Sequence, residues 1–306
     1  MPATSPLVSV VVPTHNRADL IGGTLDSILN QTFTDFEVIV VDNGSTDGTD
    51  QVVASIADPR IRYHWQEDSG LPANSRNVGI GMARGAYIAF LDSDDLWLPE
   101  KLELQMRRFS EQPDAALVYG DAIYFGDTEK AGKPLVRGMV EGRVFRELLL
   151  FNRIGTLTVV VRKDCLDEVG VFSEDPELKG AEDYHLWLRL AHRYPFAAVG
   201  QVVARYRVHD SNLIGQTAGF DAIFKVLEKV ANELGLAPQL VRRAYSLHYA
   251  GLAWSCYKSG DRPGYQAACK KALSYRFYPT LAFFRLFDLA FGPKLAMCVM
   301  KKAGFS

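Results

Sequence analysis

The sequence predicts an α/β protein with an open, mostly parallel sheet flanked by helices, followed by a helical C-terminal extension. Between residues 7 and 194, short apolar, β-branched runs alternate with segments of helical periodicity, as in strands joined by crossover helices. Near residue 215 the strand-like runs stop, while helical periodicity continues. The chain has 306 residues, 48% of them hydrophobic, which is enough for one large domain and a smaller one. We therefore expect domains at residues 1–215 and 216–306.

The first elements form a β-α-β unit. Residues 7–12 and 36–41 are continuous β-branched runs, typical of strands buried on both faces, and residues 18–29 between them have helical periodicity. This order implies a parallel pair of strands with a right-handed crossover. The same criteria predict helices over residues 46–56, 74–83 and 182–194, and strands over residues 61–65, 86–91 and 156–161. Residues 127–142 are rich in Gly, Lys and Pro, which predicts a surface loop.

The C-terminal region is helical and basic. Helices are predicted over residues 220–234, 240–259 and 263–273, with two more after them. Residues 249–272 resemble one hairpin of the tetratricopeptide kind, although such arrays need about three repeats. From Leu236 onward 11 Lys/Arg stand against 2 Asp/Glu, and residues 281–291 are apolar and aromatic. We expect these helices to associate with a membrane surface or with a second subunit; a helical cap over the sheet is the alternative.

The composition also limits the cellular setting. Residues 281–300 are the most apolar late stretch, but they contain Arg285, Asp288 and Lys294 and are not expected to span a membrane. No export signal is visible at the N-terminus, and the four cysteines lie far apart without a CxxC pair, which argues against zinc or disulfides. With a net charge of -2, we expect no nucleic-acid partner. We expect a cytoplasmic protein, either soluble or peripheral at the inner face of the membrane.

The strongest motif is an acidic cluster at the end of a strand. The apolar strand over residues 86–91 stops abruptly at the three carboxylates of Asp92, Asp94 and Asp95. Ligands of α/β sheets bind at the carboxyl ends of the strands, and oxygen-rich sites suit Mg²⁺ or Mn²⁺. The alternative is that Asp94 or Asp95 caps a helix that starts near Pro99.

Two other strand ends carry polar tips. Residues 41–49 read VDNGSTDGT and residues 13–17 read PTHNR, each following an apolar run. An ordinary turn with Thr46 or Asp47 as helix N-cap would also explain the first of these. Because the carboxyl ends of parallel strands lie on one edge of a sheet, we expect all three tips to converge there.

A second acidic motif precedes the predicted helix over residues 182–194. Glu182 and Asp183 follow Gly180 at the start of that helix. Acidic residues also stabilise helix N-termini through the helix dipole, which is the structural alternative to a catalytic role.

Taken together, these motifs resemble the family-two glycosyltransferases of the GT-A fold. The resemblance covers roughly residues 1–215, in the family's order and spacing, and rests on VVVPTHNR (residues 10–17), VDNGSTD (41–47), ARGAYIAF (83–90) and LDSDD (91–95). It implies a GT-A, Rossmann-like catalytic domain that binds a nucleoside-diphosphate sugar, with a UDP-sugar favoured. It further implies Mn²⁺ or Mg²⁺ as cofactor and inverting transfer to an oligosaccharide or lipid-linked acceptor in bacterial surface glycan synthesis.

The resemblance also implies roles for individual residues. The nucleotide pocket comprises Pro13, His15, Asp42 and Asn43, with Arg76 nearby; Asp92 and Ser93 face the ribose and the metal; Asp94 ligates the metal; Asp183 is the catalytic base; and His209 can complete the metal shell. A structural role is the alternative for His209. Asn43 departs from the family, in which many relatives have an acid that accepts the N3–H of uracil, although an amide oxygen can accept the same proton.

Two other functions compete with this one. A sugar-1-phosphate nucleotidyltransferase would share the core and the acidic metal site, but it should carry a Gly-rich, basic phosphate loop after the first strand, and residues 13–17 do not form one. A catalytically silent sugar-binding or scaffold protein of this fold is the second alternative. The presence of Asp92, Asp94 and Asp183 together argues against it.

Overall fold

The structure is a computed structural model that describes residues 5–135, 138–208 and 217–275. The chain folds into two compact units. The first comprises residues 1–148 and 152–212, and the second comprises residues 149–151 and 213–306. No helix in the described ranges is long and apolar enough to cross a membrane.

The first unit is built on one sheet with the strand order β3-β2-β1-β4-β7-β6-β8-β5. The strands are β1 (Val8–Thr14), β2 (Phe36–Asn43), β3 (Ile61–Gln66), β4 (Tyr87–Phe90), β5 (Leu96–Trp97), β6 (Leu117–Phe125), β7 (Val160–Arg162) and β8 (Phe196–Arg207). Strands β1 to β4 pair in parallel, as do β6 and β8, whereas β7 runs antiparallel to both β4 and β6, and β5 runs antiparallel to β8. The sheet is therefore mixed and mostly parallel, as the sequence predicts.

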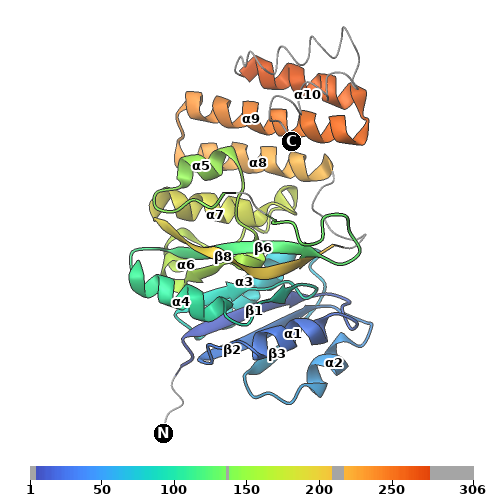
Figure 1. Cartoon of the computed structure of the whole chain (residues 1–306), viewed down its shortest axis with the longest axis vertical. Coiled ribbons are helices and arrows are strands. Elements are labelled where there is room, and N and C mark those ends of the chain that lie inside the picture. The colour runs from blue at the N-terminus through green and yellow to red at the C-terminus, as the bar shows by residue number, and fades with distance from the viewer. Residues whose placement is uncertain (1–4, 136–137, 209–216, 276–306) are drawn as a thin grey trace. The chain divides into compact units, whose positions relative to one another are not determined.

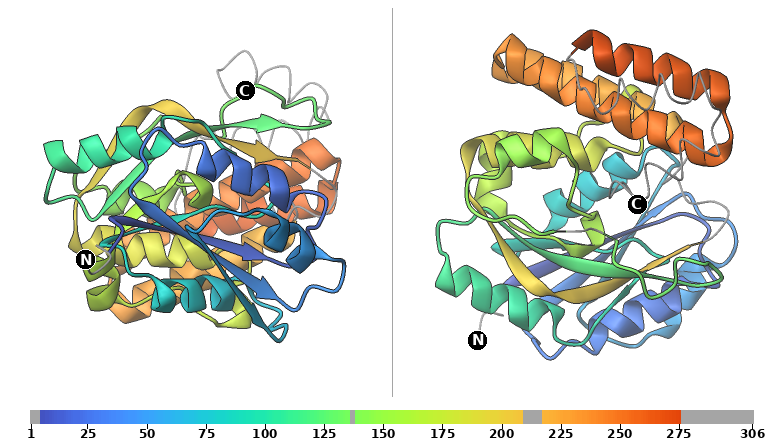
Figure 2. Two further views of the ribbon diagram at one scale, coloured as in Figure 1. Left: turned by 90° about the horizontal axis from the view of Figure 1, so that it is seen from below. Right: turned by 45° about the horizontal axis from the view of Figure 1, so that its top comes forward.

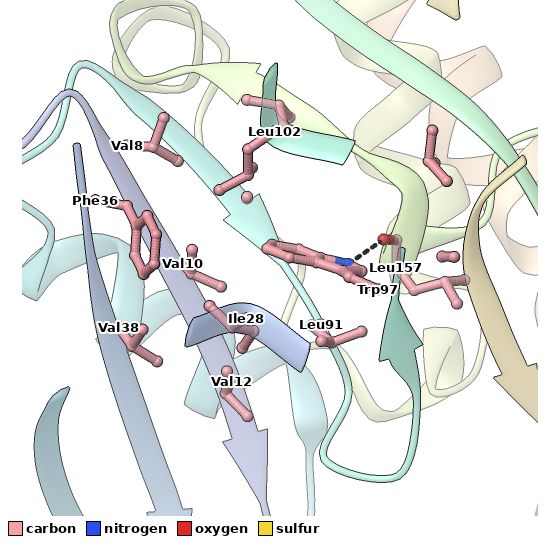
Figure 3. Packing of buried hydrophobic residues seen from close by; sticks show 14 of the residues in the cluster. Val8, Val10, Val12, Ile28, Phe36, Val38, Leu91, Trp97, Leu102 and Leu157 are labelled. Atoms are coloured by element: carbon pink, nitrogen blue, oxygen red, sulfur yellow. Dashed lines mark hydrogen bonds between the residues drawn. The ribbon is translucent and has the colours of Figure 1, made fainter. Parts of the chain in front are cut away.

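Helices cover both faces of this sheet (Figures 1 and 2). They are α1 (Ile21–Leu29), α2 (Thr49–Ser55), α3 (Pro72–Met82), α4 (Lys101–Glu111), α6 (Lys163–Val169) and α7 (Glu182–Arg193), with 3-10 turns η1 (Thr156–Thr158) and η2 (Pro176–Leu178); α5 (Phe145–Leu150) contains the division between the units. On one face, α1 and α4 pack on the even-numbered residues of β1 and β2 in a continuous apolar core (Figure 3). On the other face lie α3, whose Gly79 abuts Val11, and α7, whose Trp187 contacts Phe90.

Close packing explains one glycine of α3. A Cβ atom added at Gly79 would lie 2.4 Å from a methyl of Val11, so only glycine lets this helix approach β1 as closely as it does. The approach fixes α3 next to the carboxyl end of β1. Helix α3 carries Arg76, and its position therefore determines where that side chain reaches.

The second half of the sheet differs from the sequence prediction. The strand expected over residues 156–161 is a 3-10 turn followed by the short β7, which pairs antiparallel to its neighbours. The long strands β6 and β8 have no counterpart among the predicted elements. Both contain polar residues and glycine, and their register shifts next to Asp121, so neither shows the continuous apolar run of β1 or β2.

The second unit is helical in its described part. It contains α8 (Thr217–Leu234), α9 (Pro238–Ser259) and α10 (Arg262–Tyr275). The α9–α10 hairpin turns at Gly260, which adopts a left-handed conformation with φ 78°, and it encloses Ala253, Cys256, Tyr265 and Cys269. The apolar segment over residues 281–291 lies outside the described residues.

Candidate active site

The polar tips of β1, β2 and β4 lie at one edge of the sheet. The three strands are parallel neighbours, with Thr14 opposite Asp42 and Val11 opposite Phe90. Their chains therefore leave the sheet side by side, at the place where α/β sheets bind ligands. The convergence expected from the sequence follows from this topology.

Hydrogen bonds connect the loops after β1 and β2. His15 Nδ1 lies 2.7 Å from the carbonyl oxygen of Asn43. Asn16 has the left-handed φ of 50°; its backbone N–H donates to Ser45 Oγ at 2.8 Å, and its side-chain oxygen accepts the N–H of Thr46 at 2.9 Å. An asparagine tolerates this backbone conformation better than most residues. His15 is thereby fixed at the edge of the site.

Neither Thr46 nor Asp47 is the N-cap of α2, which is Gly48, but Asp47 binds the start of this helix. Its carboxylate accepts the N–H of Thr49 at 3.0 Å at the start of α2, and the N–H of Ala18 at 3.0 Å from the other loop. It joins the first residue of α2 to the loop after β1. We therefore assign it to the scaffold of the site.

Asp42 is fully buried, and each of its oxygens has a donor. One accepts the N–H of Ser45 at 2.8 Å and the other accepts the hydroxyl of Tyr63 at 2.7 Å. The carboxylate thus holds the turn after β2 and joins it to β3. In this structure both oxygens of Asp42 are bound by the protein itself.

The amide of Asn43 is also occupied. Its oxygen accepts hydrogen bonds from Gln66 Nε2 at 2.9 Å and from the N–H and the hydroxyl of Ser69, both at 3.1 Å. Its nitrogen donates to Asp68 at 2.5 Å. An amide oxygen has two lone pairs, so in this arrangement Asn43 has no remaining acceptor for the N3–H of a base.

The acidic motif after β4 faces two arginines. The Arg17 guanidinium lies 3.5 Å from the Asp94 carboxylate, whose side chain is 16% exposed, and Arg207 Nε donates to the carbonyl oxygen of Asp94 at 2.8 Å. Helix α4 starts at Lys101, and its N-cap, Glu100, makes no side-chain cap hydrogen bond. Neither Asp94 nor Asp95 is therefore its cap, so the capping alternative is wrong.

Asp95 links this motif to the end of β8. It is 1% exposed, and one carboxylate oxygen accepts the N–H of Arg207 at 2.7 Å. Burial raises the pKa of Asp95 well above its ordinary value, and the charges of Asp92 and Asp94 raise it further. The loop after β4 and the end of β8 are thus held together. Residue 209, expected to complete a metal shell, lies outside the described residues.

Arg76 joins the two acidic motifs. Its guanidinium donates to Asp92 at 2.8 Å and to Glu182 at 2.7 Å, across 16 and 106 residues of sequence. The Arg76 side chain is only 7% exposed, so this ion-paired contact is largely shielded from water. The structure therefore places the end of β4 and the start of α7 within reach of one side chain.

Asp183 lies beside this arginine and accepts two hydrogen bonds. One oxygen accepts the hydroxyl of Thr156 at 2.8 Å, and the other accepts the backbone N–H of Tyr184 at 2.6 Å. Burial raises the pKa of Asp183 to about 6, and the charge of Glu182 adds to this, while the Thr156 hydrogen bond and the charge of Arg76 oppose it. A raised pKa makes this carboxylate a stronger base than an ordinary aspartate.

Both donors to Asp183 are neutral, whereas Glu182 has a charged partner. One of its oxygens binds Arg76, and the other accepts the N–H of Gly180 at 2.7 Å. Its side chain is 8% exposed. The geometry thus favours Asp183 over Glu182 as the group that can receive a proton.

The carboxylates at the end of β4 fit a divalent cation shared with a phosphate ligand. Asp92 and Asp94 are partly exposed, with exposed side-chain fractions of 36% and 16%. Mg²⁺ is commonly held by one or two carboxylates together with substrate phosphates. Within the described ranges, no three His, Cys, Asp or Glu side chains are grouped so as to hold a metal ion by themselves. The donor set suits an ion that arrives with its ligand.

The comparisons with known proteins decide the family. The family model "Glycosyl transferase family 2" matches residues 9–167. The chain belongs to glycosyltransferase family 2. The matched range contains the ends of β1, β2 and β4 and all the residues expected to bind the nucleotide sugar.

Two relatives illustrate the range of lengths within this family. The chain is 30% identical over 247 residues to the E. coli enzyme "UDP-Glc:alpha-D-GlcNAc-diphosphoundecaprenol beta-1,3-glucosyltransferase WfgD", covering 79% of this chain and 92% of WfgD. It is 32% identical over 206 residues to an uncharacterized glycosyltransferase of Rickettsia bellii, covering 67% of this chain. The chain spans only 29% of the length of that Rickettsia protein.

Solved structures share the GT-A-like fold. S. aureus TarS 1–349 in complex with UDP-GlcNAc matches with a TM-score of 0.68 at 19% identity, covering 97% of this chain and 92% of that one. The mannosyltransferase PcManGT from Pyrobaculum calidifontis, in complex with GDP-Man and Mn²⁺, matches with a TM-score of 0.65 at 23% identity, covering 97% and 82%. At this level of identity the likeness shows the fold alone.

Two of the expected site residues are buried or lie within the sheet. Ser93, expected near the ribose, is 6% exposed, and Pro13 lies in β1 opposite Val41.

Sequence reasoning missed two residues that contact this site. Arg17 and Thr156 were not among the expected site residues, although they contact Asp94 and Asp183. Arg17 stands inside a recognised motif, which was a usable signal. Nothing in the local sequence around Thr156 indicates its contact with a residue 27 positions away.

Proposed function

We propose that this family member is a metal-dependent inverting glycosyltransferase. It moves a sugar from a nucleoside diphosphate to a hydroxyl of a saccharide or lipid-linked acceptor. The observation that carries the proposal is the bridge formed by Arg76, which brings the acidic motif at Asp92 to the acidic motif at Glu182 and Asp183. A transferase of this kind needs its diphosphate site and its base on either side of one anomeric carbon. One buried guanidinium that contacts both motifs supports that arrangement.

The reaction follows from the carboxylate at residue 183. Asp183 takes the proton of the acceptor hydroxyl while that oxygen forms a bond to the anomeric carbon, and the bond from this carbon to the diphosphate oxygen breaks. Attack from the face opposite the leaving group inverts the configuration. Asp94, with Asp92, would hold a Mn²⁺ or Mg²⁺ ion, which supplies positive charge to the departing diphosphate when bound.

Arg76 has a different role in this proposal from the one the sequence suggests. Because its guanidinium is paired with Asp92 and Glu182 and is nearly buried, it orients the two motifs and does not itself contact the nucleotide. Its charge also lowers the pKa of Asp183, whose carboxylate form is the active base.

We favour a UDP-sugar as donor. WfgD takes its sugar from UDP-Glc according to its name, and TarS has been solved with UDP-GlcNAc, while PcManGT has been solved with GDP-Man. The occupied amide of Asn43 implies that a uracil N3–H is not met by this side chain in the arrangement described here.

The acceptor and the setting are proposed from the relatives and from charge. The name of WfgD contains a diphosphoundecaprenol acceptor, which is a lipid. We propose an acceptor of this class in bacterial surface glycan synthesis. Residues 1–215 act as the catalytic domain and the basic region of residues 216–306 serves association, with a membrane surface or a second subunit, on the cytoplasmic side.

The test separates the metal site from the base. Asp94→Ala should weaken the binding of nucleoside diphosphate in the presence of Mn²⁺, because it removes a carboxylate of the cation site; calorimetry measures this. Asp183→Asn should lower the transfer rate by about 10² to 10⁴-fold with nearly unchanged nucleotide affinity, because only basicity is lost.

Glu182→Gln is the matched control, with thermal unfolding to confirm that each variant is folded. If Asp183→Asn keeps most of its transfer rate while Glu182→Gln loses it, Glu182 is the base. If Asp94→Ala binds nucleotide and Mn²⁺ like the parent, the metal assignment is wrong.

A further inference from the structure

We propose that Thr156 is a positioning residue for Asp183 and that buried side chains of β5 and α4 hold the turn that carries it. The inference rests on the proposed function, in which Asp183 is the base. Thr156 is the first residue of η1, a 3-10 turn just before β7. Its hydroxyl donates to Asp183 Oδ2 at 2.8 Å, and the residue is 7% exposed.

The Thr156 hydroxyl determines which way the carboxylate of Asp183 faces. One carboxylate oxygen is bound by the Tyr184 N–H and the other by Thr156, so rotation about the side chain would break at least one of these bonds. The Tyr184 bond is local and comes with the start of α7. The Thr156 bond comes from a different element, so it ties the orientation of the base to the position of η1.

Two buried side chains hold the carbonyl groups of η1 from behind. Trp97 Nε1 donates to the carbonyl oxygen of Leu157 at 2.8 Å (Figure 3). Gln105 Nε2 donates to the carbonyl oxygens of Thr158 and Val118, both at 2.8 Å, and so joins η1 to β6. Trp97 is 4% exposed and Gln105 is fully buried. The two residues after Thr156 are therefore both anchored through their backbones.

A buried lysine completes this support. Lys101 Nζ donates to Gln105 Oε1 at 2.6 Å and lies 4.1 Å from the centre of the Trp97 ring. Lys101 is fully buried, and burial lowers its pKa well below the ordinary value. Placing a lysine and a glutamine in an apolar core costs stability unless their hydrogen bonds are satisfied. Here the hydrogen bonds orient the Gln105 amide so that its N–H₂ group faces η1.

The groups around Asp183 determine how its pKa would change if the Thr156 hydroxyl were removed. The charged groups that face Asp183 are Glu182 on its own helix, which raises its pKa, and Arg76 from α3, which lowers it; the neutral Thr156 comes from η1. The Thr156 bond stabilises the carboxylate form, so its removal raises the pKa of Asp183 above about 6. The acidic limb of the pH–rate profile should then move to higher pH.

The experiment compares Thr156→Val, which keeps the shape and loses the hydroxyl, with Thr156→Ser, which keeps the hydroxyl. For Thr156→Val we expect the acidic limb to rise by about one pH unit, through the loss of one hydrogen bond to a charged group. At pH values above this limb kcat should still fall about tenfold, because the carboxylate is no longer held in one orientation. Nucleotide affinity with Mn²⁺ should stay within about twofold of the parent, because the hydroxyl contacts the base and not the donor. Thr156→Ser should keep both the rate and the pH profile of the parent.

A second variant tests the support behind η1. Trp97→Phe removes the donor to Leu157 and should shift the acidic limb in the same direction, but by less. In the Thr156→Val background Trp97→Phe should have no further effect on that limb, because the link it acts through is gone. If Thr156→Val does not fold, the comparison of Thr156→Ser with Thr156→Ala decides by the same readouts.

The inference and the proposed function fail differently. An unchanged pH profile and kcat in Thr156→Val, with transfer abolished in Asp183→Asn, overturns the positioning role and leaves the base assignment intact. Transfer retained in Asp183→Asn overturns the base assignment itself. A loss of nucleotide affinity in Thr156→Val equal to its loss of kcat would show a structural effect on the whole site and would also overturn the positioning role.

Discussion

Glu37 shows how single residues hold the strands in register at the end of the sheet opposite the site. One carboxylate oxygen accepts the Ser9 hydroxyl at 2.7 Å and the Arg84 N–H at 2.8 Å; the other accepts the guanidinium groups of Arg62 and Arg84 at 2.8 and 2.7 Å. Glu37 thus joins β1, β2, β3 and the loop before β4. Burial would raise the pKa of Glu37, but the hydrogen bonds from Arg84, Arg62 and Ser9 lower it to about 2.

Glu37→Gln should lower the free energy of unfolding by about 2 kcal/mol at pH 7, because it removes the charge of a buried carboxylate that accepts hydrogen bonds from two arginines. The folded-state pKa of Glu37 lies below the ordinary value of 4.5. Its contribution is therefore present above pH 4.5 and is lost as the pH falls towards 2. Urea unfolding should show the difference between parent and variant shrinking as the pH is lowered across this range.

Glu111→Gln is the matched control for Glu37. Glu111 is paired with Arg108 at 2.9 Å, but its side chain is 52% exposed, and exposed pairs contribute little. Its substitution should change the unfolding free energy by less than about 1 kcal/mol. A difference for Glu37→Gln that stays constant from pH 7 to the acid limit would contradict the ionic account.

Among the elements, α3 links fold to site because it packs closely on β1 and carries Arg76. Two glycines of this helix provide a matched pair. A Cβ atom at Gly79 would lie 2.4 Å from Val11, whereas a Cβ atom at Gly81 would have nothing within 4 Å.

Gly79→Ala should destabilise the protein by about 1–3 kcal/mol, because overpacking outweighs the gain in helix propensity. Gly81→Ala should stabilise it by about 0.5–1 kcal/mol, because the same gain meets no steric opposition. Chemical unfolding of the two variants measures both effects. Equal shifts for the two would show that the contact with Val11 relaxes without cost, against our account of how α3 is placed.

For the molecule as a whole, charge is divided unevenly along the chain. In the described part of α9 and α10, the basic residues are exposed; they are Arg242, Arg243, Lys258, Arg262, Lys270 and Lys271. Between Pro238 and Tyr275 the acidic residue is Asp261, which lies between the two helices. Basic residues near an anionic lipid surface contribute about 1 kcal/mol each, and salt screens the attraction.

The full chain should therefore sediment with vesicles that contain anionic lipid, fail to sediment with neutral ones, and be released by high salt. Light scattering of the same sample tests association with a second subunit. A monomer that ignores anionic vesicles would rule out both forms of association proposed for this region. Binding to neutral and anionic vesicles alike would show an apolar contact and contradict the electrostatic account.

The sequence by itself determined the first half of the sheet and the edge of the site. β1, β2 and β4 are short apolar runs buried on both faces, and each stops at a polar tip, so local composition defines both the strand and its end. Parallel pairing then brings these tips to one edge, which made Asp42, Asn43, Asp92 and Asp94 candidate residues before any coordinates. The family resemblance added their expected roles.

Only the tertiary structure decided the second half of the sheet and the contacts between the side chains of the site. The antiparallel insertion of β7, the register shift between β6 and β8, and the contacts of Arg76 with Glu182 and of Thr156 with Asp183 all join segments far apart in the chain. Such contacts depend on how packed elements close large loops, and no local periodicity encodes them. Asn43 is a second example. Its residue type allows its amide oxygen to accept the N3–H of uracil, but in the structure Gln66 and Ser69 already donate to that oxygen.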